Sequence, residues 1–266
     1  MGKLIEPKIT LITWTKDPVK AIASQVMNMS GEMVHNLNEI PESRAEAILQ
    51  ELKKTGLGGA LEMLDLVFQI ENVPRSFTHQ LVRNRVGATY HQESLRFTDR
   101  IGGFDYDIGE DILKNPEATV EFKDAMNMIA QAYDTIKGMD ISTQDARGVL
   151  PIAIATKVGF KVNFKTLIHM SHVRLCHQSQ PHWFKIMKMM KQEIIDKIDP
   201  VLGEFLVAAC EATGRCEYKA IFDRKCPKEK VLIHKYCLDC ENVDICGLNK
   251  GKDPVYCGAM KNLMRL

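Results

Sequence analysis

The sequence predicts a chain that combines β-strands with α-helices, and two kinds of segment indicate it. Lys8–Trp14, Leu64–Ile70 and Ile152–Val162 are short and have strand character, with β-branched or other apolar residues. Other stretches carry apolar residues at helical spacing, and the longest of them covers Glu117–Lys137. Gly102–Asn115 has neither pattern, so we expect an irregular, mobile segment there that could act as a lid.

The remaining helices are predicted where a capping residue or a proline precedes an amphipathic stretch. They cover Asp17–Met29, Pro41–Gly56, Ser76–Arg85, a brief turn from Ser142 or Thr143 to Gly148, Phe164–Cys176, and two further helices within Lys185–Gly214. Asp17 and Asn163 are the expected N-caps of the helices that they precede, and Pro18 and Pro74 occupy the first turns that tolerate proline.

Length and charge limit the kinds of protein to which this chain can belong. A chain of 266 residues suits one large domain, or one domain with a small appendage. The 35 Lys and Arg nearly balance the 34 Asp and Glu, so no global field attracts nucleic acid, and anion recognition must be local. The N-terminus lacks the apolar core of a signal peptide and no apolar run is long enough to span a bilayer, so we expect a cytoplasmic protein without membrane contact.

The stretch from Thr78 to Asp99 concentrates polar groups that suit an anionic ligand. Arg83, Arg85 and Arg96 carry planar guanidinium groups that bind phosphate or carboxylate oxygens two at a time. The alternative is a solvated face with surface ion pairs. Small and apolar neighbours favour an arginine that faces a cleft, because Arg83 and Arg85 lie on different sides of a helix. Gln80, three residues before Arg83, would share its face.

This stretch resembles the signature of flavin-dependent thymidylate synthases. In that family Arg-His-Arg is followed by a seven-residue spacer and a Ser, with Arg-Tyr just beyond. Here Arg83-Asn84-Arg85 precedes Glu93-Ser94-Leu95-Arg96-Phe97. Asn84 replaces the histidine that contacts the flavin, Phe97 replaces the tyrosine, and the spacer has eight residues. Either Gln92 or Glu93 therefore takes the place of the family's acid, and we favour Glu93 for its charge.

The resemblance extends from about Thr10 to Pro227. Gln80 lies where the family has a substrate-binding Gln, and Arg147 lies in an Arg-x-x-Leu-Pro motif like the one whose Arg binds the nucleotide. Family positions occupied by Asn, Arg, Asn and Arg carry Asn163, Lys165, His169 and Arg174. Lys165 keeps the charge but loses the fork, and His169 changes the available hydrogen bonds. Of the family's motif before the second strand, only Glu62 is present.

The resemblance implies an α/β fold, with an antiparallel or mixed sheet flanked by helices, and a homotetramer whose active sites lie between subunits. It implies reductive methylation of dUMP to dTMP: methylene-tetrahydrofolate gives the carbon, NADPH reduces bound FAD, and the flavin supplies the hydride. The dinucleotide-binding pattern G-x-G-x-x-G is missing from the sequence, so a Rossmann oxidoreductase is disfavoured and the flavin would be held by arginines and amides.

The same resemblance assigns residues to each ligand. For dUMP they are Gln80, Arg83, Gln92, Glu93, Ser94, Leu95, Arg96, Arg147 and Arg174, and for FAD they are Arg83, Asn84, Arg85, Glu93, Asn163, Lys165 and His169. Arg174 is the expected catalytic residue, because a fixed guanidinium beside the imide edge of uracil would stabilise the charge that builds there. Ser94 lacks an evident base partner, so we expect it to bind rather than attack.

A cysteine-rich tail over residues 226–266 follows the expected main domain of residues 1–225. Cys237 and Cys240 form a C-x2-C pair, and Cys246 and Cys257 follow among loop-forming residues. Such a set can bind one zinc ion, with Cys226 and His234 as spare ligands; an iron-sulfur cluster and unligated thiols are the alternatives. His172, His177 and His182 have no recognised ligand spacing, so we expect no metal there.

Two other functions remain open from the sequence. A related enzyme could transfer a different one-carbon group to a pyrimidine nucleotide, and Asn84 and the longer spacer motivate that reading. A zinc-stabilised nucleic-acid-binding protein built on the tail is the second alternative, although the even charge balance speaks against it.

Overall fold

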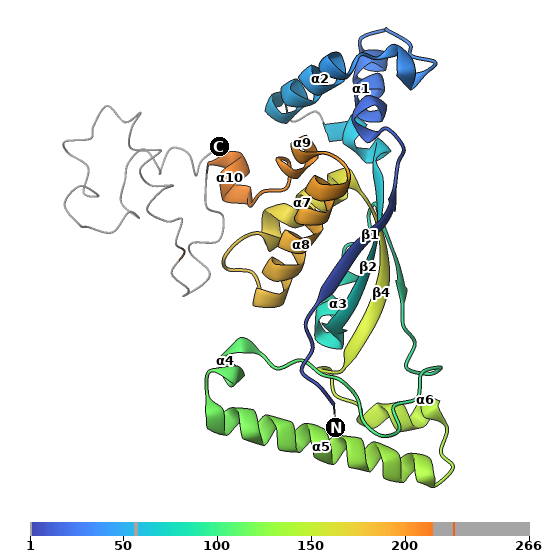
Figure 1. Ribbon diagram of the computed structural model, residues 1–266, viewed down its shortest axis with the longest axis vertical. Coiled ribbons are helices and arrows are strands. Elements are labelled where there is room, and N and C mark those ends of the chain that lie inside the picture. The colour runs from blue at the N-terminus through green and yellow to red at the C-terminus, as the bar shows by residue number, and fades with distance from the viewer. Residues whose placement is uncertain (1, 56–57, 215–225, 227–266) are drawn as a thin grey trace, which may run out of the picture.

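The computed structural model of this chain describes residues 2–55, 58–214 and 226 (Figure 1). A four-stranded antiparallel sheet runs along its length in the order β1-β2-β4-β3. Its strands are β1 Lys8–Trp14, β2 Asp65–Pro74, β3 Ala88–Gln92 and β4 Ala155–Asn163. The expectation of a sheet flanked by helices is confirmed, with a purely antiparallel sheet.

The helices of the described residues cluster along one face of the sheet and at its two ends. They are α1 Pro18–Met29, α2 Glu42–Thr55, α3 Arg75–Leu81, α4 Glu110–Leu113, α5 Pro116–Gly138, α6 Thr143–Ala146, α7 Phe164–Arg174, α8 Pro181–Lys197, α9 Pro200–Gly203 and α10 Ala209–Thr213. Short 3-10 turns cover Leu37–Glu39, Gly58–Met63 and Arg147–Val149.

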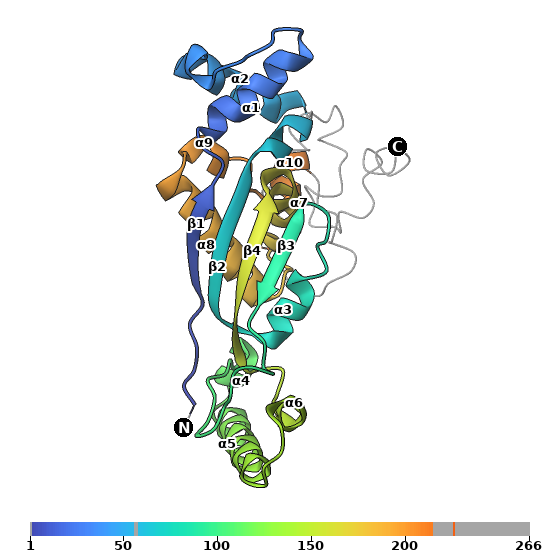
Figure 2. The same ribbon diagram turned by 90° about the vertical axis from the view of Figure 1, so that its right-hand side faces the viewer.

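Alternation along the strands decides which face is covered. In the central parts of β2 and β4 every second residue is apolar and buried, as Phe68 and Phe160 are, while residues between them such as Gln69 and Lys161 point the other way. The helices α3, α7 and α8 pack on the buried side (Figure 2). Trp183 of α8 is completely buried there. The opposite face of the sheet carries polar side chains, so helices lie on only one side of it.

A second core lies at the end of the sheet where α5 crosses (Figure 1). It packs α5 against the segments before and after it, and its buried members are Leu95, Phe104, Tyr106, Ile108, Met126 and Ile154. The helices α1 and α2 occupy the opposite end of the sheet. The expected irregular segment Gly102–Asn115 is present, with the short α4 within it.

The edge strand β1 contains an irregularity between Leu11 and Thr13. There the Leu11 N–H donates to Glu193 Oε2 of α8 at 2.6 Å, and the Leu11 carbonyl accepts from Lys197 Nζ at 3.0 Å. Backbone groups that the neighbouring strand does not use are thus satisfied by side chains. The pKa of Glu193 lies below its ordinary value, because the Leu11 amide and Lys197 outweigh the opposing effect of burial.

Two sequence predictions about helix starts are confirmed and a third is partly wrong. Asn163 caps α7, since its side chain accepts from Thr166 N at 2.8 Å, and Ser142 rather than Thr143 caps α6. Asp17 precedes α1 as expected, but it makes no side-chain capping bond. Its backbone is left-handed, with a φ of 47°, and that conformation makes the turn from β1 into the helix.

The largest difference from the sequence prediction lies in the arginine-rich stretch. The helix expected over Ser76–Arg85 ends at Leu81, and the strand β3 over Ala88–Gln92 was not foreseen. β3 pairs with β4, and Tyr90 stacks on Phe160 with ring centroids 5.2 Å apart. Tertiary pairing outweighs local pattern here, because a five-residue strand with polar residues carries little signal of its own.

Among the described residues, no helix is both long and apolar enough to cross a bilayer. The cysteines of the expected zinc site, Cys237, Cys240, Cys246 and Cys257, lie outside the described residues, as does His234. The same holds for nearly all of the tail 226–266.

Candidate active site

A cavity of about 500 Å³ lies between α7, the turn that precedes β3 and the 3-10 turn over Gly58–Met63. Its lining unites residues from three distant parts of the chain: Glu62, Arg83, Asn84, Arg85, Val86, Asn163, Lys165, Thr166, His169, Met170, Val173 and Arg174. All the residues assigned to FAD by resemblance except Glu93 are among them. The structure therefore brings that set together in one place, although its ligand stays a prediction.

Helix α7 supplies one wall of the cavity because of its periodicity. Lys165, His169 and Val173 are four residues apart, so they project from one side of the helix, with Thr166 and Met170 beside them. Asn163, which caps the helix, stands at the rim. The positive end of the helix dipole and the Lys165 ammonium together favour negative charge at this end of the cavity.

The facing wall is the turn between α3 and β3, and Gly87 allows it to approach α7. Gly87 has a φ of +67°, and a Cβ there would lie 2.3 Å from Asn163 Nδ2 and 2.4 Å from Thr166 Oγ1. Thr166 Oγ1 donates to the Val86 carbonyl at 3.0 Å, and Asn163 N donates to the Gly87 carbonyl at 2.8 Å. Only glycine fits here without displacing the start of α7.

Cations outnumber anions around the cavity. Lys165 Nζ lies 2.6 Å from Glu62 Oε1, so these two charges offset each other. Arg83 and Arg85 are exposed, and neither guanidinium has a hydrogen bond or ion pair with a residue that the structure describes. Glu62, which the sequence supported only weakly, is thus a member of the site. It belongs to the site because it forms an ion pair with Lys165 across the cavity.

Arg174 lines the cavity where α7 ends. Its guanidinium carbon lies 4.4 Å from the centroid of the Trp183 ring, and Trp183 packs in turn on Phe77 of α3. A guanidinium held over the face of a buried indole is attracted by the electrons of the ring, so this contact helps to position Arg174 at the cavity. The Gln80 amide donates to Gln180 Oε1 at 2.7 Å nearby, which ties α3 to the start of α8.

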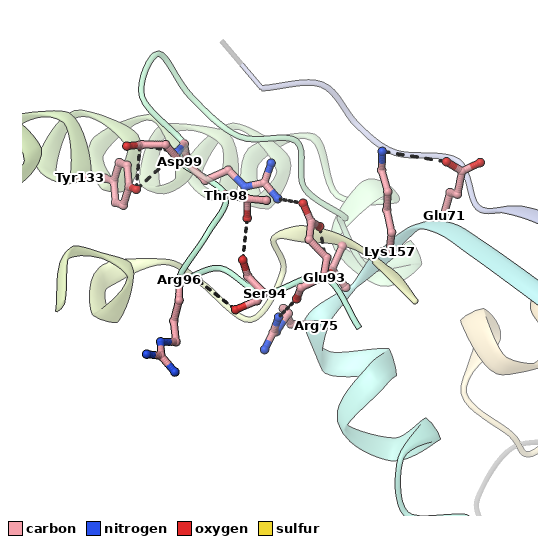
Figure 3. Close-up of polar contacts among 11 residues, drawn as sticks. Glu71, Arg75, Glu93, Ser94, Arg96, Thr98, Asp99, Tyr133 and Lys157 are labelled. Carbon is pink, nitrogen blue, oxygen red and sulfur yellow. Dashed lines mark hydrogen bonds and ion pairs between the residues drawn. The ribbon is translucent and has the colours of Figure 1, made fainter. Parts of the chain in front are cut away.

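A second group of predicted residues lies at the other end of β3, around Glu93 and Ser94 (Figure 3). The two groups are separated by the strand, whose five residues span roughly 14 Å. Arg174 belongs to the cavity end, whereas Ser94, Arg96 and Arg147 do not line that cavity. Within one copy of the chain the residues assigned to dUMP are therefore divided between two places.

Glu93 is engaged by protein groups at this second end. Arg100 Nη2 donates to Glu93 Oε1 at 2.7 Å, with only 23% and 17% of the two side chains exposed, and Thr156 Oγ1 lies 3.3 Å from Oε2. Gln92 donates its amide to Thr78 Oγ1 at 2.8 Å. The Leu95 side chain lies in the second core, so only its backbone is available to a ligand. The ligand roles predicted for these three residues stay untested.

Ser94 and Arg96 are less constrained. Arg96 is exposed, its guanidinium lies 5.7 Å from the Phe97 ring, and its backbone N–H donates to Ser94 Oγ at 3.3 Å. The Ser94 carbonyl accepts from Thr98 Oγ1 at 3.0 Å, which shapes the turn. In Figure 3 the side chains of Arg75 and Arg96 extend away from the helix that carries Tyr133.

Arg75 is the residue that sequence reasoning missed. Its Nη1 donates to the Glu93 carbonyl at 3.2 Å. Burial lowers the pKa of Arg75, the neighbouring Arg147 lowers it further, and Glu93 opposes the shift. Two guanidinium groups near enough to repel each other favour an anion between them. A sequence signal existed: Arg75 is the first residue of α3, where the helix dipole disfavours a cation.

The described residues hold no group of three or more His, Cys, Asp or Glu side chains that could bind a metal ion. Instead, His182 Nε2 lies 2.9 Å from Asp107 Oδ1, which connects α8 to the irregular segment before α4. His177 packs on the ring of Phe184, with 5.0 Å between the ring centroids.

Comparison with known proteins identifies the family of the chain. Residues 10–201 match the family model described as thymidylate synthase complementing protein. Flavin-dependent thymidylate synthases of Nitratidesulfovibrio vulgaris and Clostridium tetani are 28% and 30% identical to the chain, over 79% and 81% of its length and 91% and 92% of theirs. That of Geobacter sulfurreducens is 32% identical, over 65% of this chain and 75% of its own.

A solved structure has the same fold. The UMP/dUMP methylase PolB of Streptomyces cacaoi, solved with 5-Br dUMP, superposes with a TM-score of 0.65 at 15% identity, over 77% of this chain and 96% of its own. Because the family model covers most of the chain, the match favours the enzyme over a nucleic-acid-binding protein. The chain belongs to the flavin-dependent thymidylate synthase family.

Proposed function

We propose that this protein converts dUMP to dTMP by reductive methylation, with FAD as cofactor, methylene-tetrahydrofolate as carbon donor and NADPH as electron donor. One observation carries the proposal: the residues that the resemblance assigns to FAD, from the turn before β3 and from α7, line a single cavity together with Arg174. A concave site with a few convergent polar groups is typical of ligand pockets.

The cavity suits a flavin in size and in chemistry. Its volume of about 500 Å³ lies within the range of ligand pockets. Arg83, Arg85 and Lys165 would hold the anionic and carbonyl oxygens of FAD, and the amides of Asn84 and Asn163 would complement its polar edges. Bound there, FAD supplies the hydride for the reduction.

Arg174 has the geometry for activating the pyrimidine. Trp183 holds its guanidinium plane, and its charge would stabilise the negative charge that develops on the imide edge of uracil. Among the described residues the Ser94 hydroxyl contacts the Arg96 backbone N–H and no base, which supports binding rather than nucleophilic attack.

The nucleotide phosphate would bind at the other end of β3. Arg75, Arg147, Arg96 and Ser94 offer charge and hydrogen-bond donors there, and the first two already lie near each other. Because Arg174 lies at the cavity end, we propose that a second copy of the chain completes each site, in a homotetramer. Exposed apolar residues at both ends, such as Val86 and Phe97, support such a contact.

The test uses the full-length protein. We expect purified protein to absorb as a flavoprotein and, given dUMP, methylene-tetrahydrofolate and NADPH, to form dTMP. Reactions that lack one component identify the donor of the carbon and of the electrons. A protein that binds no FAD from solution, or that forms a pyrimidine nucleotide other than dTMP, contradicts the proposal.

For the tail we propose, separately, a domain of residues 226–266 that binds zinc through Cys237, Cys240, Cys246 and Cys257. Metal analysis of the purified chain tests it: about one zinc per chain is expected, and brown absorbance with iron indicates a cluster instead.

A further inference from the structure

Lys137 lies near the end of α5 and is mostly buried, with 17% of its side chain exposed. Its ammonium group donates to the Ile141 carbonyl at 3.0 Å and to Thr143 Oγ1 at 3.2 Å, and it lies 3.8 Å from Asp99 Oδ2. Burying an ammonium group is costly unless partners of this kind satisfy it. Lys137 therefore joins two segments that are far apart in the sequence, one containing Asp99 and the other Thr143.

The segment with Asp99 is the continuation of the turn that carries Arg96. Asp99 Oδ1 accepts from the Tyr133 hydroxyl of α5 at 3.0 Å (Figure 3), and from the two backbone N–H groups that follow it at 2.7 and 3.2 Å. Burial and the hydrogen bond to Asp99 raise the pKa of Tyr133, so its hydroxyl stays a donor at neutral pH. Asp99 is thus held on α5 by Tyr133 and Lys137, which lie one helical turn apart.

The segment with Thr143 carries Arg147. Thr143 is the first residue of the short α6, and Arg147 directly follows the last. Burial and, next in weight, the charge of Arg147 lower the pKa of Arg75, so these two guanidinium groups lie near each other. The hydrogen bond from Lys137 to Thr143 therefore acts on the position of one member of this arginine pair.

We propose that Lys137 is a positioning residue for the nucleotide phosphate: it holds Asp99 and Thr143, and so fixes the two loops from which Arg96 and Arg147 reach that phosphate. The proposal rests on the proposed function, which assigns the phosphate to this end of β3. Lys137 itself makes no contact with substrate, because protein groups occupy its ammonium. Two arginines that bind one phosphate must keep their separation, so a shift of either loop weakens the contacts.

Lys137→Met tests this, because it keeps the apolar stem and removes the ammonium group. Calorimetric titration of the full-length protein with dUMP should show binding roughly tenfold weaker, the weight of one charge-assisted contact. In turnover the KM for dUMP should rise by a similar factor while kcat stays within about twofold, because the cavity with Arg174 is unchanged. Deoxyuridine, which lacks the phosphate, should inhibit both proteins with the same inhibition constant.

Lys123→Met makes the same change at an exposed position of α5 and should bind dUMP like the unchanged protein. Thr143→Val removes one acceptor of the Lys137 ammonium and should weaken dUMP binding roughly threefold. It replaces K137M if that variant does not fold, as judged by circular dichroism.

The outcomes separate this inference from the proposed function. If the unchanged protein does not bind dUMP, the proposed function itself fails. If it binds dUMP but K137M, or T143V in its place, binds dUMP equally well, the inference about Lys137 is overturned. The same holds if dUMP and deoxyuridine lose affinity by the same factor, because Lys137 would then support the fold rather than the phosphate contacts.

Discussion

The two ends of β3 differ in the partners of their arginines. At the end before the strand, Arg83 and Arg85 line a cavity without a polar partner for either guanidinium among the described residues. At the end after the strand, Arg100 is paired with Glu93 at 2.7 Å, and Arg75 donates to the Glu93 carbonyl. Both ends are rich in arginine, but Arg100 is paired with a carboxylate, whereas Arg83 and Arg85 have no such partner among the described residues.

This difference in partners indicates two roles for the arginines, support of the fold and binding of a ligand. A guanidinium that the protein already satisfies positions other groups, and its removal should cost stability. A guanidinium left unsatisfied beside a cavity gains its partner from a ligand, so its removal should cost affinity with little change in stability. Substitutions at the two ends therefore distinguish the two roles.

The largest effect is expected at Arg174. Arg174→Ala should lower dTMP formation roughly 10³-fold, because the charge that forms on the pyrimidine loses its fixed cation. Turnover with saturating substrates measures this, and thermal unfolding checks that the fold persists. Arg174→Lys keeps the charge but loses the planar contact with Trp183, so it should recover little activity. Full activity of R174A would remove Arg174 from the mechanism.

A smaller effect is expected for the cavity arginines. Arg85→Ala should weaken FAD binding about tenfold to a hundredfold, the weight of a charge-assisted contact, and change the free energy of unfolding by less than about 0.5 kcal/mol. Flavin fluorescence and chemical denaturation give the two values. Arg44→Ala, which removes an exposed partner of Glu32, is the matched control and should leave FAD affinity unchanged.

At the end of β3 that carries Glu93, replacing an arginine by alanine should lower the stability of the fold. Arg100→Ala leaves the Glu93 carboxylate half-satisfied in a site with 17% of its side chain exposed, and should destabilise the fold by roughly 2–3 kcal/mol. Denaturant unfolding measures this. The exposed Arg44–Glu32 pair again provides the comparison, and Arg44→Ala should cost much less stability than Arg100→Ala. Equal losses in the two variants would mean that burial adds nothing at Glu93.

The smallest expected effect is on the pH dependence of stability, through the contact of Glu193 with the edge strand β1. The pKa of Glu193 is lower in the folded protein than its ordinary value of 4.5. Its contribution to the free energy of unfolding is therefore present above pH 4.5 and is lost as the pH falls through the lower folded pKa. Glu193→Gln removes this dependence. We expect the unchanged protein to exceed E193Q in stability by about 1 kcal/mol near neutral pH, with the gap closing below pH 4.5. A gap that stays constant with pH contradicts the assignment.

Much of the fold could be predicted because its main elements carry local signals. β1 is rich in β-branched residues, β2 and β4 alternate apolar with polar residues over much of their length, α5 is amphipathic, and Asn163 caps the helix that it precedes. β3 could not be predicted, since it exists through its pairing with β4. The turn after α3 could not be predicted either, since it depends on the close approach of Gly87, with its positive φ, to the start of α7.

The candidate site, too, could be predicted only in part from the sequence. Motif spacing identified the residues of the cavity, because chemistry requires those side chains whatever the local structure. It could not separate them from the residues beyond β3, because sequence distance does not report that a strand stands between Arg85 and Ser94. Arg75 was missed because it lies outside the signature, and Glu62 because a single matching residue carries little information.

Subunit mixing tests the central claim most directly, that the two ends of β3 from different copies complete one active site. Arg174→Ala damages the cavity end and Arg96→Ala the other end, so each alone should be nearly inactive. Co-expressed or mixed after reversible dissociation, they should form some sites with both intact halves and recover measurable dTMP formation. A mixture of R174A with Arg174→Lys, both damaged at the cavity end, should recover none. Absence of recovery in the first mixture, with mixed oligomers verified by mass, would contradict the account.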